Sequence, residues 1–204
     1  MKNILIFGTS RTGKTSLAKR LKDEFQLNVV NEDHLIYAFE RAFPHLEING
    51  DENYMQTAIN VTPFIVHYFC ELAQSANYKT GSKFVADTTF FVFDTGIPLM
   101  KETLQKMNGL KLLDEFIFIN LDNNKTSEEL FNDVRKYDTT EDWTYSLSDD
   151  ELRKHCEENV GIDWAFYDKW KELEFLRYDV AEGREQVFNK IVEDLKLTHR
   201  RHKQ

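Results

Sequence analysis

The sequence predicts an α/β protein in which helices cover both faces of a mostly parallel β-sheet. Short apolar runs alternate along the chain with segments of helical periodicity, and this alternation is typical of parallel βαβ units. The 204 residues are 41% hydrophobic and 13% aromatic, which is enough to form one core without disulfides or a structural metal. No repeat or linker interrupts the pattern, so we expect a single domain over residues 1–204.

Five short runs, most of them apolar, supply the expected strands. In the first, Ile4–Phe7 follow one another without polar alternation and lead into Gly8, which is typical of a strand buried on both faces. The fourth run has the same character and is the clearest of the five. The expected strands are residues 3–7, 27–30, 83–87, 115–121 and 175–180.

Amphipathic segments between these runs supply the expected helices. Leu17, Leu21 and Phe25 recur every four residues and therefore share one helical face. Thr62–Pro63 resembles an N-cap followed by proline at the first helical position, and Asn108–Gly109 is typical of a helix end. The expected helices are residues 14–25, 34–43, 51–60, 62–78, 98–108 and 184–197.

Negative charge is concentrated between the fourth and fifth strands. The chain has a formal net charge of −9, and residues 122–163 hold 13 acids and 5 Lys or Arg, a local net of −8. This segment is either a solvated helical surface or a mobile flap over an active site. Ser148 and Glu151 have the spacing of a capping box, which predicts a helix from about residue 149.

The acidic balance argues against nucleic acid or an acidic membrane surface as a partner. No apolar run approaches the ~18 residues of a membrane span, and the N-terminal run lacks a small-residue cleavage site. We therefore expect a cytoplasmic protein that is a monomer or homodimer. Cys70 and Cys156 form no metal-binding spacing, and we expect both to be reduced thiols.

One motif indicates the chemistry. Residues 8–15 match G-x-x-x-x-G-K-[ST] at every fixed position, directly after the first strand and at the start of a helix. The two glycines allow a tight turn around an anion, Lys14 can reach the β- and γ-phosphates of a nucleotide, and Thr15 can ligate Mg²⁺. The expected nucleotide-binding residues are Gly8, Thr9, Ser10, Arg11, Thr12, Gly13, Lys14, Thr15 and Ser16.

With this motif and order of elements, the chain resembles the small P-loop kinases, which include adenylate, shikimate and gluconate kinases. The resemblance extends over nearly the whole chain, whereas GTPases are unlike it because residues 124–127 lack the aspartate of N-K-x-D. It implies a three-layer P-loop NTPase sandwich with a five-stranded parallel sheet in the order 2-3-1-4-5. It also implies ATP and Mg²⁺ as cofactors, an acceptor-binding segment at 34–80 and a helical lid insert at 122–163.

Asp33 and Asp87 follow the second and third expected strands. Shikimate-kinase-like enzymes carry Asp-x-Asp at the first place, where this chain has Asn31-x-Asp33, and the resemblance implies that Asp33 contacts the acceptor hydroxyl. Asp33 could also be the N-cap of the helix 34–43. The resemblance implies that Asp87 holds Mg²⁺ through water together with Thr15, or binds the acceptor; a strand-end cap is the alternative.

Arg135 lies in the acidic insert. Lid arginines of the resembling kinases neutralise the transferring phosphoryl group, so the resemblance implies a catalytic role for Arg135 beside Lys14 and Asp33. A surface ion pair is the alternative, and Arg153 is a weaker second candidate.

The expected activity is an ATP-dependent transfer of the γ-phosphoryl group to an acceptor hydroxyl or phosphate. The resemblance favours a nucleoside or nucleotide as the small-molecule acceptor, and the acidic insert favours a neutral or cationic one such as an amino sugar. Two other functions remain open: a non-catalytic ATP-binding regulator, and an ATPase in which water attacks the γ-phosphate.

Overall fold

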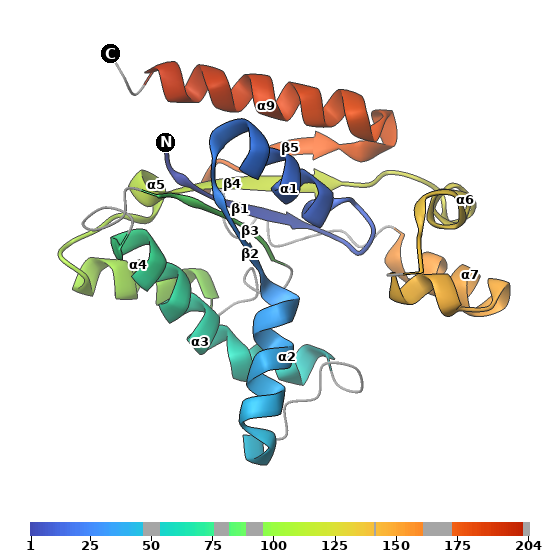
Figure 1. Cartoon of the computed structure of the whole chain (residues 1–204), viewed down its shortest axis with the longest axis horizontal. Coiled ribbons are helices and arrows are strands. Elements are labelled where there is room, and N and C mark those ends of the chain that lie inside the picture. Colours follow the sequence, from blue (N-terminus) through green and yellow to red (C-terminus); the bar gives the residue numbers. More distant parts are fainter. Residues whose placement is uncertain (47–53, 76–81, 89–95, 141, 161–172, 202–204) are drawn as a thin grey trace.

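The computed structural model contains a five-stranded parallel sheet in the order β2-β3-β1-β4-β5, as expected (Figure 1). It describes residues 1–46, 54–75, 82–88, 96–140, 142–160 and 173–201. The strands are β1 (Asn3–Gly8), β2 (Asn28–Asn31), β3 (Phe84–Asp87), β4 (Phe116–Asp122) and β5 (Leu176–Asp179).

The helices form two layers around this sheet, with α1 and α9 on one face and α3 and α4 on the other (Figure 1). The 3₁₀ turns are Pro44–Leu46, Trp143–Ser146 and Val180–Glu182. The described helices are α1 (Lys14–Phe25), α2 (Glu32–Ala42), α3 (Tyr54–Ser75), α4 (Gly96–Lys106), α5 (Leu112–Glu115), α6 (Ser127–Tyr137), α7 (Asp149–Asn159) and α9 (Arg184–Arg201).

Strand β1 separates two hydrophobic cores. Its side chains alternate between the faces: Leu5 and Phe7 pack with α3 and α4, whereas Ile4 and Ile6 pack with α1 and α9. All six residues of β1 are buried, as expected for the centre of a parallel sheet with both faces covered.

The expected boundary at Thr62–Pro63 is wrong. One helix, α3, runs through it, with Pro63 in its interior. Proline removes one main-chain hydrogen bond, but Val61, Ile65 and Phe69 are fully buried on either side, and their burial stabilises the continuous helix. The parts of the expected helices at 51–53 and 76–78 lie outside the described residues.

Other element boundaries also differ from the expectation. Helix α2 starts at Glu32 with Asn31 as its N-cap, because the Asn31 side chain accepts a hydrogen bond from the main-chain N–H of His34 at 3.0 Å. Asp33 is therefore inside the first turn and is not the cap. Helix α4 begins at Gly96 rather than Pro98, and the short α5 was not expected.

Helices α6 and α7 lie together beyond the carboxyl end of β4, apart from the layers that cover the sheet (Figure 1). They share a small core of Leu130, Phe131, Val134, Leu152 and Cys156. The capping box of Ser148 and Glu151 is formed and starts α7 at residue 149, as expected. Both cysteines are free and buried. None of the helices among the described residues is long and apolar enough to cross a membrane.

Phe118 belongs to the hydrophobic core between the sheet and helices α3 and α4. Its ring lies 6.1 Å from Phe7 and 5.6 Å from Phe175, measured between centroids, and the side chain is 1% exposed. We expect Phe118→Ala to lower the free energy of unfolding by about 3–5 kcal/mol because it leaves a cavity. Phe43→Ala, the same change at a ring that is 42% exposed, should cost clearly less. Chemical denaturation measures both; equal losses would contradict this description of the core.

Candidate functional site

The motif at residues 8–15 forms a tight loop at the end of β1. Gly8 has φ +149°, and a Cβ atom there would lie 2.7 Å from both the Leu121 carbonyl oxygen and the Thr12 Oγ1. Gly13 has φ +90°, and a Cβ atom there would lie 3.1 Å from the Arg184 Nε. Both positions favour glycine because their positive φ values strain other residues, and at Gly8 a side chain would also collide with the Leu121 main chain.

The start of α1 has the character of an anion site. Its N-cap is Gly13, which provides no side-chain hydrogen bond to the first turn, so no cap side chain covers the main-chain N–H groups there. The Lys14 Nζ donates to the carbonyl oxygens of Gly8 and Thr9, each at 2.9 Å, and is thereby held across the loop. Burial lowers the pKa of Lys14, while the nearby carboxylates of Asp33, Asp87 and Glu32 oppose that shift.

Asp87 is the central carboxylate next to the loop. Its Oδ2 accepts hydrogen bonds from Thr15 Oγ1 at 2.6 Å and from Asn31 Nδ2 at 3.0 Å. The residue is 5% exposed, and its Oδ1 is buried without a hydrogen-bond partner. A buried carboxylate oxygen without a partner is suited to accept a hydrogen bond from a water molecule that is bound to a cation.

The residues of this site fit Mg²⁺ in the way P-loop proteins use it. Among the described residues, no group of three or more His, Cys, Asp or Glu side chains forms a metal site by itself. Mg²⁺ is commonly held by one or two protein oxygens, with phosphates and waters completing its shell. Thr15 and Asp87, which the sequence singled out, lie side by side as such a pair would.

Asn31 and Glu32 belong to the site although sequence reasoning did not include them. Strand register places Asn31 beside Asp87, so its amide holds one carboxylate oxygen while its own oxygen caps α2. Glu32 is 2% exposed and accepts a hydrogen bond from the Thr88 hydroxyl at 2.6 Å. The available signal was the polar run Asn-Glu-Asp directly after an apolar strand.

Asp33 lies in the first turn of α2, near Lys14 and Asp87, and one part of the residue is exposed while its carboxyl group is close to these charges. Partial loss of surrounding water raises the pKa of Asp33 above its ordinary value of 3.8, and the charge of Asp87 raises it further. Lys14 and His34 act in the opposite direction. The structure therefore brings together Lys14, Thr15, Asp33 and Asp87, while their roles stay predictions.

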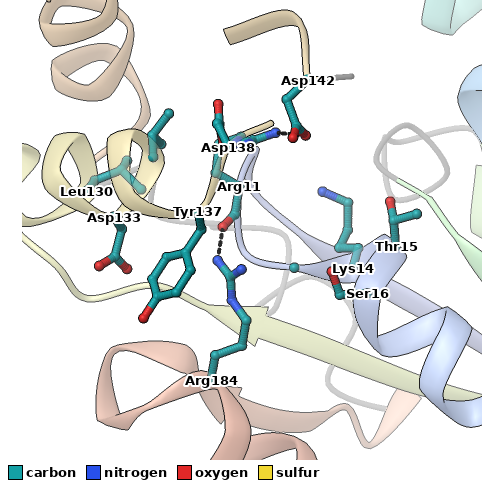
Figure 2. A pocket seen from close by; sticks show the side chains of 12 residues that line it. Arg11, Lys14, Thr15, Ser16, Leu130, Asp133, Tyr137, Asp138, Asp142 and Arg184 are labelled. Atoms are coloured by element: carbon teal, nitrogen blue, oxygen red, sulfur yellow. Dashed lines mark hydrogen bonds and ion pairs between the residues drawn. The ribbon is translucent and has the colours of Figure 1, made fainter. Parts of the chain in front are cut away.

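A cavity of about 220 Å³ adjoins the loop between α6 and the start of α9 (Figure 2). Arg184 enters it from α9, and its Nη2 donates to the Arg11 carbonyl oxygen at 3.0 Å. Neither Arg184 nor Tyr137 was a predicted site residue, and only the tertiary structure places them here. The cavity is lined by Arg11, Gly13, Lys14, Thr15, Ser16, Leu130, Asp133, Val134, Tyr137, Asp138, Asp142 and Arg184.

Arg135 does not line this cavity. Its Nη2 donates to Asp149 Oδ1 and to the Leu147 carbonyl oxygen, each at 2.7 Å, so it joins α6 to α7. Arg153 pairs with Glu128 in the same way. Arg135 therefore makes a surface ion pair, which was the alternative to a catalytic role. Its contact with a phosphoryl group stays a prediction.

Solved structures of small kinases match the chain over nearly its whole length. A gluconokinase of Sinorhizobium meliloti covers 97% of this chain and 97% of its own, at 12% identity and a TM-score of 0.52. A sugar kinase of Janibacter sp. covers 96% and 95% at 16% identity and 0.53. A shikimate kinase of Bacteroides thetaiotaomicron covers 96% and 98% at 16% identity and 0.50.

The chain has the fold of the small P-loop kinases. No protein-family model and no curated protein matches the sequence. At such low identities the likeness establishes the fold alone.

The raised pKa of Asp33 has a consequence for stability. A carboxyl group whose pKa is higher in the folded than in the unfolded protein destabilises the fold while it is ionised, and this cost disappears as the pH falls. We therefore expect Asp33→Asn to raise Tm at pH 7 and the gain to shrink as the pH approaches about 4. Thermal unfolding between pH 4 and 8 measures this. A lower Tm for the variant at pH 7 would contradict the described electrostatics.

Proposed function

We propose that the protein is a cytoplasmic ATP- and Mg²⁺-dependent kinase that transfers the γ-phosphoryl group to a hydroxyl of a small molecule. The observation that carries the proposal is the meeting of an anion-binding loop with carboxylates at the carboxyl ends of β2 and β3. Such a site has one side for a polyphosphate and one for a proton-donating acceptor. The two buried free thiols are compatible with a reducing compartment.

Each residue has a separate task in this proposal. Main-chain N–H groups of residues 8–15 and the Lys14 ammonium bind the phosphates, while Thr15 and Asp87 hold Mg²⁺, the latter through water. Bound Mg·ATP supplies the phosphoryl group that is transferred. Asp33 orients the acceptor hydroxyl and accepts its proton, and its raised pKa makes it a better base than an ordinary aspartate.

The insert of residues 122–163 is proposed to act as the lid of this site. The C-terminal part of α6 and Asp142 border the cavity beside the loop (Figure 2). A lid over the phosphates excludes water from the γ-phosphoryl group and so favours transfer to the acceptor over hydrolysis.

The charge around Asp33 favours an acceptor without negative charge. Glu32, Asp33 and Asp87 surround this side, and the proposed acceptor-binding segment 34–80 holds five acids and two Lys or Arg. Tyr37 lies one helical turn after Asp33 and is 41% exposed, and an exposed aromatic ring at this spacing supports a flat acceptor. We therefore propose a nucleoside as the first choice of acceptor and an amino sugar as the second.

The first test is ADP release from Mg·ATP with separate pools of nucleosides, nucleotides, sugars and amino sugars. We expect release with one pool only, and we expect Lys14→Ala to lower kcat/KM by at least ~100-fold through lost phosphate stabilisation. Lys19→Ala removes an exposed lysine from the same helix and is the matched control. Equal release in every pool would indicate an ATPase instead. ATP binding without release would indicate a regulator.

A second test uses matched acceptors that differ by one phosphate. We expect a nucleoside to be phosphorylated with a kcat/KM at least ~10-fold higher than its 5′-monophosphate, because the carboxylates on the acceptor side repel the added charge. Initial rates at two salt concentrations measure the difference, which should narrow at the higher one. A preference for the monophosphate would contradict the proposed acceptor class while leaving the kinase activity in place.

A further inference from the structure

Arg11 has an unusual conformation for its place in the loop. It occupies a position at which the motif sets no residue type, yet its φ is +66°, in the left-handed region that favours glycine. A non-glycine residue persists in this region when its surroundings hold it there.

The Arg11 guanidinium contacts two carboxylates of the insert. Its Nη1 donates to Asp142 Oδ1 at 2.9 Å, and its Nη2 forms an ion pair with Asp138. The Asp138 side chain is 3% exposed, and its other oxygen accepts a hydrogen bond from the Thr144 hydroxyl. Asp142 also accepts from the Thr139 main-chain N–H at 2.9 Å. Both carboxylates are thus fixed where they meet Arg11.

These contacts balance the charges that line the cavity. Three carboxylates border it, those of Asp133, Asp138 and Asp142. Asp133 pairs with Lys125, and the other two pair with Arg11. An unpaired carboxylate beside the phosphates of a nucleotide would repel them, most strongly for Asp138 because it is buried.

We propose that Arg11 is a positioning residue that joins the phosphate-binding loop to the segment carrying Asp138 and Asp142 and neutralises both carboxylates there. Nucleotide affinity then depends on Arg11 through these acids, rather than through a direct bond from its guanidinium to phosphate. This inference rests on the proposed binding of a nucleoside triphosphate at the loop. It assigns a function to the side chain of a motif position that otherwise contributes only its main chain.

A double-mutant cycle distinguishes an effect of Arg11 through Asp138 and Asp142 from a direct contact of its guanidinium with phosphate. Arg11→Gly suits the left-handed φ, and Arg11→Asn is a second variant that tolerates the same backbone. The acids are neutralised by Asp138→Asn with Asp142→Asn. Calorimetric titration with Mg·ATP and Mg·ADP measures Kd in the wild type, each variant and the combination.

We expect Arg11→Gly to weaken ATP binding at least ~10-fold, with a smaller loss for ADP, because the released acids repel the more highly charged ligand more strongly. In the chain with both acids neutralised, the same change should alter Kd by less than ~3-fold. An equal loss in both backgrounds would show a direct phosphate contact and overturn the proposal.

Amide hydrogen exchange without nucleotide provides an independent readout. Exchange around Asp142–Ser146 should be at least ~10-fold faster in Arg11→Gly and Arg11→Asn, with α9 unchanged as the internal control for folding. Arg153→Gln, which breaks an exposed ion pair between α6 and α7, should leave that stretch as slow as in the wild type. Unchanged exchange in both Arg11 variants would overturn the proposal. If the wild type binds neither nucleotide, the proposed function fails, whereas this comparison still tests the Arg11 contacts.

Discussion

The burial of β1 between β3 and β4 is the constraint on which the rest of the molecule depends. Because all six of its residues are buried, its register fixes both neighbours and both helical layers. The same register brings the end of β1 next to the ends of β3 and β4. Gly8 fits there only because it lacks a side chain, so the packing of the sheet and the shape of the loop of residues 8–15 have one cause.

Charged side chains with shifted pKa values lie together near the carboxyl ends of the strands. Loss of surrounding water raises the pKa of Asp33, the charge of Asp87 raises it further, and burial lowers the pKa of Lys14 beside them. Asn31 and Thr15 stabilise the negative charge of Asp87 because both donate hydrogen bonds to its carboxylate. Carboxylates set against each other in this way are hard to explain by stability alone, whereas a site that binds a cation and moves a proton requires them.

The acidic insert has a small hydrophobic core of its own, separate from the two cores at the sheet. Helices α6 and α7 share their own small core, and Arg135 joins them to each other. Charged side chains join the insert to the loop of residues 8–15, with Arg11 contacting Asp138 and Asp142. A separate core of this kind is consistent with the proposed role of the insert as a lid, which would move as one unit.

The sequence by itself determined the features that depend on neighbouring residues: five strands, the turn of the loop, the capping box that starts α7, and Asp33 and Asp87 at strand ends. It misplaced a boundary at Pro63, because burial along α3 outweighs one lost hydrogen bond. Only the tertiary structure decided which arginines reach the loop. Arg184 meets Arg11 across 173 positions, while Arg135 turns to α7, and such pairings follow from packing between distant elements rather than from local pattern.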